Sequence, residues 1–127
     1  MEKKLYREEL TQMEINAHRA SLNGEPAVYC GTYGKYNNGD ISGMWVDVAS
    51  FADYEEFMEF CERVHADEED VELMFQDYEG FPYAWYSESG MGEETFDKIK
   101  EFAALDNNKR EAYEAYLDNY DSEASVE

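Results

Sequence analysis

The chain has 127 residues, of which 31 are Asp or Glu and only 10 are Lys or Arg, so its formal net charge is −21. So few basic residues cannot neutralise many phosphates, which argues against direct nucleic-acid binding and favours a basic partner. The 7 Phe, 11 Tyr and 2 Trp argue against a disordered acidic tail. No apolar run approaches the ~18 residues of a membrane helix. The N-terminus lacks the apolar segment of a secretory signal. The two cysteines lie in apolar runs, which indicates a reducing compartment, so we expect a cytoplasmic protein.

The charge is concentrated in the middle of the chain. Residues 1–26 carry a net charge of −1, whereas the segment Asp40–Glu94 contains 17 acidic residues and a single basic one, Arg63. Like charges at this density destabilise a compact state, whereas a merely solvated surface mixes its signs. We therefore infer that the function of the protein uses this charge.

The first 26 residues are expected to form an N-terminal helical extension. Their pattern predicts a helix over residues 4–22, and Asn23-Gly24 followed by Pro26 marks its end. We expect this extension to pack on the body of the protein or on a partner. The prediction rests on apolar residues that recur at spacings of three and four, namely Tyr6, Leu10, Met13, Ala17 and Ala20.

A β-hairpin follows the extension. Residues 27–33 are rich in β-branched and aromatic side chains, which predicts a strand. Residues 34–40 are predicted to form a loop, in which Asn38-Gly39 is a strong turn dipeptide. Residues 42–48 alternate between two faces and predict the returning antiparallel strand.

Residues 53–65 carry the clearest helical pattern in the chain. Asp53 and Glu56 have the spacing of a capping box at its start. On a helical wheel, one continuous arc is apolar and is expected to pack on the sheet. The opposite arc is expected to face solvent, and it holds Glu55, Glu56, Glu59, Glu62 and Arg63.

The remaining segments complete an α+β fold. Residues 72–77 predict a third strand, and residues 83–86 a short extended piece. Two helices, over residues 93–105 and 108–120, are expected to be antiparallel neighbours because their connection is short. We thus predict a three-stranded antiparallel sheet with a packed helix, followed by a helical segment.

We divide the chain into three parts. Residues 1–26 form the extension, residues 27–84 form the α+β domain, and residues 85–127 form a helical domain with a frayed acidic tail.

No pattern of residues points to catalysis or to a cofactor. There is no Ser/His/Asp arrangement and no H-E-x-x-H sequence. Cys61 and His65 lie four residues apart on one helix, but a zinc site normally needs at least three protein ligands. Cys30 and Cys61 each lie in an apolar run, which is typical of buried free thiols in a reducing compartment. We expect neither an enzyme nor a metal protein. An enzyme that uses carboxylates, or a protein that binds metal weakly, stays open as an alternative.

Several ordered segments of the chain resemble the ArdA antirestriction family. They are Val28-Tyr-Cys-Gly-Thr-Tyr-Gly-Lys-Tyr-Asn-Asn-Gly-Asp40, Gly43-Met-Trp-Val-Asp47, Phe57 through Cys61, His65-Ala-Asp-Glu-Glu-Asp70 and Phe75-Gln-Asp-Tyr-Glu-Gly-Phe-Pro82. The resemblance spans about residues 27–82, and residues 83–120 are similar in kind to the helical middle segment of the family. The chain is shorter than the family pattern, so we expect most of the C-terminal dimerisation domain to be missing.

The resemblance implies a function. ArdA proteins are non-enzymatic mimics of DNA, carried by conjugative elements, that occupy the DNA site of the methyltransferase core of type I restriction–modification enzymes and so protect incoming DNA. Members form homodimers, which makes a homodimer possible here. The acidic residues at matching motif positions are Asp40, Asp47, Asp67, Glu68, Glu69, Asp70, Asp77 and Glu79.

The full candidate surface for a basic partner adds the acidic residues of the helix and of the flanking segments. These additional residues are Glu55, Glu56, Glu59, Glu62, Glu72, Glu88, Glu93 and Glu94. The alternative function is an acidic adaptor that binds another basic DNA-binding protein.

Overall fold

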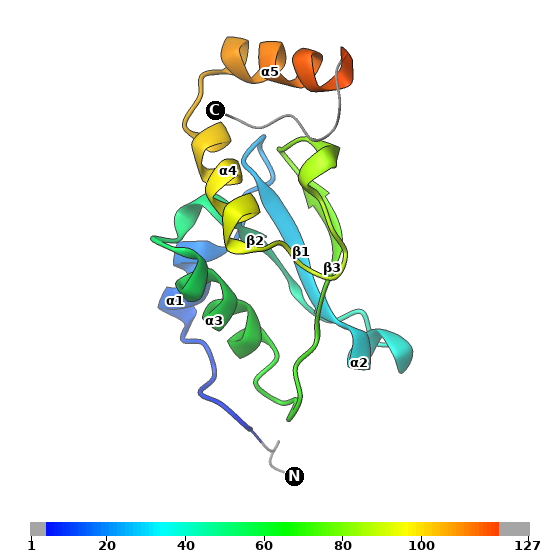
Figure 1. Cartoon of the computed structure of the whole chain (residues 1–127). Helices are drawn as coiled ribbons and strands as arrows, with labels where there is room; N and C mark the ends of the chain where they lie inside the picture. The colour runs from blue at the N-terminus through cyan, green and yellow to red at the C-terminus, as the bar shows by residue number, and fades with distance from the viewer. Residues whose placement is uncertain (1–4, 120–127) are drawn as a thin grey trace.

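The computed structural model describes residues 5–119. A three-stranded sheet stands at its centre, with β1 (Ala27–Thr32) between β2 (Met44–Asp47) and β3 (Leu73–Glu79), and both pairings are antiparallel. The helix α3 (Tyr54–Val64) lies beside the sheet (Figure 1). The predicted α+β class and its antiparallel sheet are confirmed. None of the helices within residues 5–119 is long and apolar enough to cross a membrane.

The core lies between the sheet and the helices. Phe57 of α3 is fully buried, and its ring stacks on Phe75 of β3 at a centroid distance of 5.9 Å. It also contacts Phe51 at 5.4 Å and Phe96 at 5.5 Å. Burying one such side chain stabilises the fold by about 1.5–3 kcal/mol. The apolar arc of α3 therefore faces the sheet, and its acidic arc faces outward.

The start of α3 is set by its predicted cap. The Asp53 carboxylate accepts a hydrogen bond from the backbone N–H of Glu56 at 2.9 Å. The Glu56 carboxylate accepts from the N–H of Ala52, at 3.3 Å, instead of from that of Asp53. The reciprocal bond of a capping box is thus shifted by one residue, while both side chains still satisfy free N–H groups.

The predicted helix over residues 4–22 is wrong in its extent. The helix α1 is only Gln12–His18, and it begins at a capping box between Thr11 and Glu14. The residues before it are held by distant parts of the chain, as the Tyr6 N–H donates to the Ala66 carbonyl at 2.8 Å. These tertiary contacts compete successfully with a helical turn, whose own stability is marginal at this length. The segment nevertheless packs on the body of the protein.

The loop predicted over residues 34–40 begins with a short helix, α2 (Tyr33–Asn37). The hydroxyl of Thr32, at the end of β1, accepts from the Lys35 N–H at 3.1 Å and caps this helix. The strand predicted over residues 42–48 is shorter, because a 3₁₀ turn, η1 (Val48–Ser50), follows β2.

The third strand runs two residues further than predicted, to Glu79. Gly80 then turns the chain with a φ of +81°, and a Cβ there would lie 2.3 Å from the Glu25 carbonyl oxygen. The residues predicted as extended, 83–86, instead form a 3₁₀ turn, η2 (Tyr83–Trp85).

The two C-terminal helices form as predicted, but their relative orientation differs from the prediction. They are α4 (Glu93–Ala103) and α5 (Asn107–Asn119), and α5 crosses the end of α4 instead of running back along it (Figure 1). Tyr113 holds α5 there, because its ring contacts Trp85 at 6.0 Å and Phe102 at 6.4 Å. The acidic tail predicted at the C-terminus lies outside the described residues.

Candidate partner-binding surface

The acidic arc of α3 is presented to solvent, as the wheel predicts. Glu55, Glu56, Glu59 and Glu62 are all exposed. The packing of the opposite arc on the sheet fixes the helix, so these carboxylates share one rigid support. Such a support limits the loss of entropy when a partner binds.

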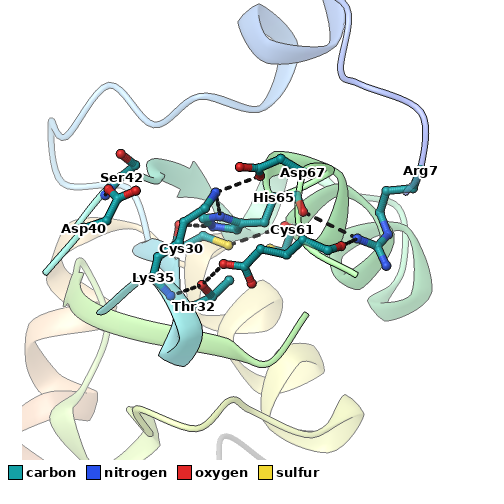
Figure 2. Close-up of polar contacts among 10 residues, drawn as sticks. Arg7, Cys30, Thr32, Lys35, Asp40, Ser42, Cys61, His65 and Asp67 are labelled. Atoms are coloured by element: carbon teal, nitrogen blue, oxygen red, sulfur yellow. Dashed lines mark hydrogen bonds and ion pairs between the residues drawn. The ribbon is translucent and has the colours of Figure 1, made fainter. Parts of the chain in front are cut away.

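The loop after α3 is tied to α2 by a partly buried polar contact (Figure 2). The ammonium of Lys35 donates to His65 Nδ1 at 2.9 Å and to the Asp67 carboxylate at 2.9 Å. Because an ammonium only donates, Nδ1 of His65 is the acceptor and its Nε2 carries the proton. Nε2 donates that proton to the Cys30 carbonyl at 3.0 Å. Both ring nitrogens are therefore engaged, and neither His65 nor the buried Cys61 is presented to a metal from solvent.

The acidic segment Asp67–Asp70, which we call the acidic loop, is held from two sides. The Thr32 hydroxyl donates to the Glu68 carboxylate at 2.7 Å. From the N-terminal segment, the Arg7 guanidinium (Figure 2) donates to the Glu68 carbonyl at 2.8 Å. It also donates to the Glu69 carbonyl at 3.3 Å. The backbone of this loop is consequently fixed. The side chains of Asp67 and Glu68 are half-buried, and those of Glu69 and Asp70 are exposed.

The acidic loop and Asp40 border a shallow hollow of about 430 Å³, which is also lined by Lys35. Hydrogen bonds from Ser42 lower the pKa of Asp40, so this carboxyl stays ionised. The structure therefore brings Asp40 and the acidic loop together, although 27 or more residues separate them in the sequence.

Other predicted residues have local structural roles. Asp47 is half-buried and caps η1 by accepting from the Ala49 N–H, and burial raises the pKa of its carboxyl. Asp77 accepts from the N–H of Tyr78. Glu93 and Glu94 lie in the first turn of α4, where negative charges interact favourably with the helix dipole and stabilise the helix.

The predicted acidic residues do not form one cluster, but most of them are exposed. Only Asp47, Asp67 and Glu68 are half-buried. The exposed ones are Asp40, Glu55, Glu56, Glu59, Glu62, Glu69, Asp70, Glu72, Asp77, Glu79, Glu88, Glu93 and Glu94.

Several basic side chains, in contrast, turn toward the protein. Arg7 and Lys35 hold the acidic loop, as described above. Lys100 donates to two backbone carbonyls just before α3, and Arg110 donates to carbonyls at the end of α4. Carbonyls in the last turn of a helix lack intrahelical partners four residues on, so Arg110 satisfies groups that α4 leaves open. Among the other basic residues of the described part, Arg19 and Lys109 stay exposed and Lys98 pairs with Glu94 at 3.8 Å, so the inward turn applies to some of the basic side chains.

Arg63 shows the same behaviour and reveals a residue that sequence reasoning missed. Its guanidinium pairs with the Glu14 carboxylate at 2.7 Å and donates to the backbone carbonyls of Glu8 and Glu9. The single base within the acidic segment is thereby masked by the N-terminal segment. The capping-box pattern Thr11-x-x-Glu14 was a signal for the start of α1, but the pairing with Arg63 has no signature in sequence.

The comparisons with known proteins agree with these features. The family model described as antirestriction protein (ArdA) matches residues 28–127. No curated protein and no solved structure matches the chain. The matched part includes the sheet, α3 and the acidic loop, and it leaves out the N-terminal segment with α1. Because the match covers most of the chain, the chain belongs to the ArdA antirestriction family.

Proposed function

We propose that the protein is a DNA mimic that occupies the DNA site of a type I restriction–modification enzyme, at its methyltransferase core, and so blocks restriction of incoming DNA. Membership of the ArdA family supports the antirestriction part of this proposal. The observation that carries the mimicry is the placement of charge around α3 and the acidic loop. The carboxylates of α3 and those of Glu69 and Asp70 are exposed, whereas the neighbouring Arg7, Lys35 and Arg63 turn inward.

The number of charges and the size of the chain are compatible with this role. Duplex DNA carries one charge per about 1.7 Å of its axis, so about 21 charges correspond to ~10 base pairs, or ~35 Å. A folded chain of this length has a radius of gyration of about 14 Å, hence a similar long dimension. The protein therefore holds about as much charge as the stretch of duplex that it would replace.

The physical mechanism is competition for a basic surface. A DNA-binding channel is lined by Lys and Arg, and it gains affinity when counterions are released from the charges that it meets. Carboxylates on a packed helix and on a fixed loop enter that channel without first being ordered. While the mimic is bound there, it excludes DNA from the channel.

The test is transfer of an unmodified plasmid into cells with a type I restriction enzyme, with and without this protein. We expect the protein to restore transfer toward the efficiency of a modified plasmid, which serves as the control. In parallel, the purified protein should displace labelled duplex from the purified methyltransferase core. Equal restriction in both strains, together with no displacement, would refute the proposal. A pull-down that instead returned one abundant basic protein from a restriction-negative host would support the acidic adaptor.

A further inference from the structure

The N-terminal segment forms a groove with α3. The groove has a volume of about 460 Å³, and we call it the α1–α3 groove. Two of its lining residues, Glu14 and His18, come from the segment that precedes the family match. The others lie on α3 or just before it, and they are Phe51, Asp53, Glu55, Glu56, Glu59, Phe60 and Arg63.

One side of the groove is built from aromatic rings. The imidazole of His18 stacks on Phe51 with a centroid distance of 3.9 Å and an interplanar angle of 9°. It meets Phe60 edge-on at 5.0 Å, and its Nδ1 lies 2.8 Å from the Ser50 hydroxyl. Because Phe51 and Phe60 are buried, the ring of His18 is fixed against the body of the protein.

The rest of the lining is strongly acidic. Five carboxylates and one guanidinium line the groove, and the guanidinium of Arg63 is already paired with Glu14 at 2.7 Å. That ion pair lowers the pKa of Glu14 to about 2, so the pair stays ionised at neutral pH. Of the remaining four carboxylates, all on exposed residues, those of Asp53 and Glu56 accept backbone N–H bonds at the start of α3, whereas those of Glu55 and Glu59 make no hydrogen bond or ion pair with the described part of the chain.

We propose that the α1–α3 groove receives a Lys or Arg side chain of the basic protein that this chain inhibits, an inference that rests on the proposed function. The chemistry matches such a side chain, whose apolar stem can pack on the half-buried His18 ring while its charged head meets carboxylates. A partner that binds DNA presents these side chains at its surface. The N-terminal segment is thus part of the partner-binding surface, and Glu14 keeps Arg63 from repelling the incoming cation.

This role of Glu14 can be tested by a double-mutant cycle, because it predicts that a second substitution, at Arg63, restores the affinity that a substitution at Glu14 loses. The full chain is titrated against a purified type I methyltransferase core at low salt. In Glu14→Gln, Arg63 faces the groove without its counter-charge, and we expect affinity to fall about tenfold. In the double variant Glu14→Gln/Arg63→Gln, the unmasked charge is gone, and affinity should return to within about threefold of the parent. If the ion pair only stabilised the fold, the second substitution would not restore the affinity.

Controls separate charge from folding. Glu9→Gln removes the same charge from the same segment outside the groove, and it should change affinity less than about twofold. The ring-proton shifts of His18, which the stacked Phe51 displaces, report whether the groove is intact in each variant. If the double variant loses that signature, Glu59→Gln in the groove is compared with Glu101→Gln on α4, and only the former should weaken binding.

The outcomes distinguish the two proposals. If the parent protein does not bind the methyltransferase core, the proposed function fails and this inference falls with it. If the parent binds but Glu14→Gln binds equally well, or if Glu59→Gln and Glu101→Gln lose affinity equally, only the groove is refuted. Failure of rescue with an intact His18 signature likewise overturns the groove and leaves the proposed function standing.

Discussion

Charge removal from α3 provides the most direct test of mimicry. The carboxylates of Glu55, Glu59 and Glu62 are exposed and make no hydrogen bond or ion pair with the described part of the chain. Replacing all three with Gln keeps the size and polarity of each side chain. Exposed substitutions of this kind change stability by no more than about 0.5 kcal/mol each. The fold should therefore persist while three charges disappear from the proposed contact.

The size of the effect follows from counterion release. On the DNA scale, each lost contact flattens the dependence of log affinity on log salt by about 0.9, so three lost contacts flatten it by about 2.7. Between about 50 and 200 mM salt, the parent should lose roughly 40-fold more affinity than the triple variant. The assay is titration of the methyltransferase core over that range of salt.

A matched triple variant controls for net charge. Glu101, Glu111 and Glu114 are exposed on α4 and α5, outside the predicted surface, and their replacement with Gln removes the same three charges. We expect the salt dependence of this variant to stay close to that of the parent. If both triple variants flatten the slope equally, only net charge matters. An unchanged slope in the α3 variant would show that α3 does not contact the partner.

Three further predictions concern the scaffold. Phe57→Ala removes a fully buried ring and should lower the free energy of unfolding by about 3–5 kcal/mol, measured in urea; a loss under about 1 kcal/mol would contradict the packing. Asp53→Ala removes the cap of α3 and should cost about 1 kcal/mol by thermal unfolding, whereas Asp53→Asn should be nearly neutral. The hydrogen bond from Arg63 and that from the Thr11 backbone lower the pKa of Glu14 from 4.5 to about 2, so this contribution to stability is present above pH 4.5 and is lost as pH falls toward 2. NMR titration should show the pKa of Glu14 rising toward 4.5 in Arg63→Gln, and an unchanged pKa would show that the ion pair is absent in solution.

Local patterns predicted the elements whose partners are close in sequence. The 3.6-residue period of α3, with Asp53 at its start, identified both the buried and the acidic arc. The alternation in residues 42–48 and the turn at Gly39 identified the β1–β2 pairing. These signals succeed because burial of an apolar face and capping of a helix depend on residues within a few positions of one another.

Local patterns gave wrong predictions where residues far apart in the sequence form the contacts that decide the local structure. The apolar spacing before Thr11 is helical, yet Tyr6 and Arg7 bond instead to backbone carbonyls of the acidic loop region, about sixty residues away. The short connection between α4 and α5 favours an antiparallel pair, yet Tyr113 finds its partners on Trp85 and Phe102. Propensity and loop length are weak terms, so a few tertiary contacts outweigh them.

By itself, the sequence determined the total charge of the protein, its concentration between Asp40 and Glu94, and the acidic arc of α3. These properties follow from composition and from helical periodicity. Only the tertiary structure decided where the counter-charges go. It pairs Arg63 with Glu14 and turns Lys35 toward His65, so these two positive charges lie against the protein instead of extending into solvent. The physical reason is that a basic side chain is drawn to whichever unsatisfied carbonyl or carboxylate the fold brings near, and that neighbour is set by three-dimensional packing.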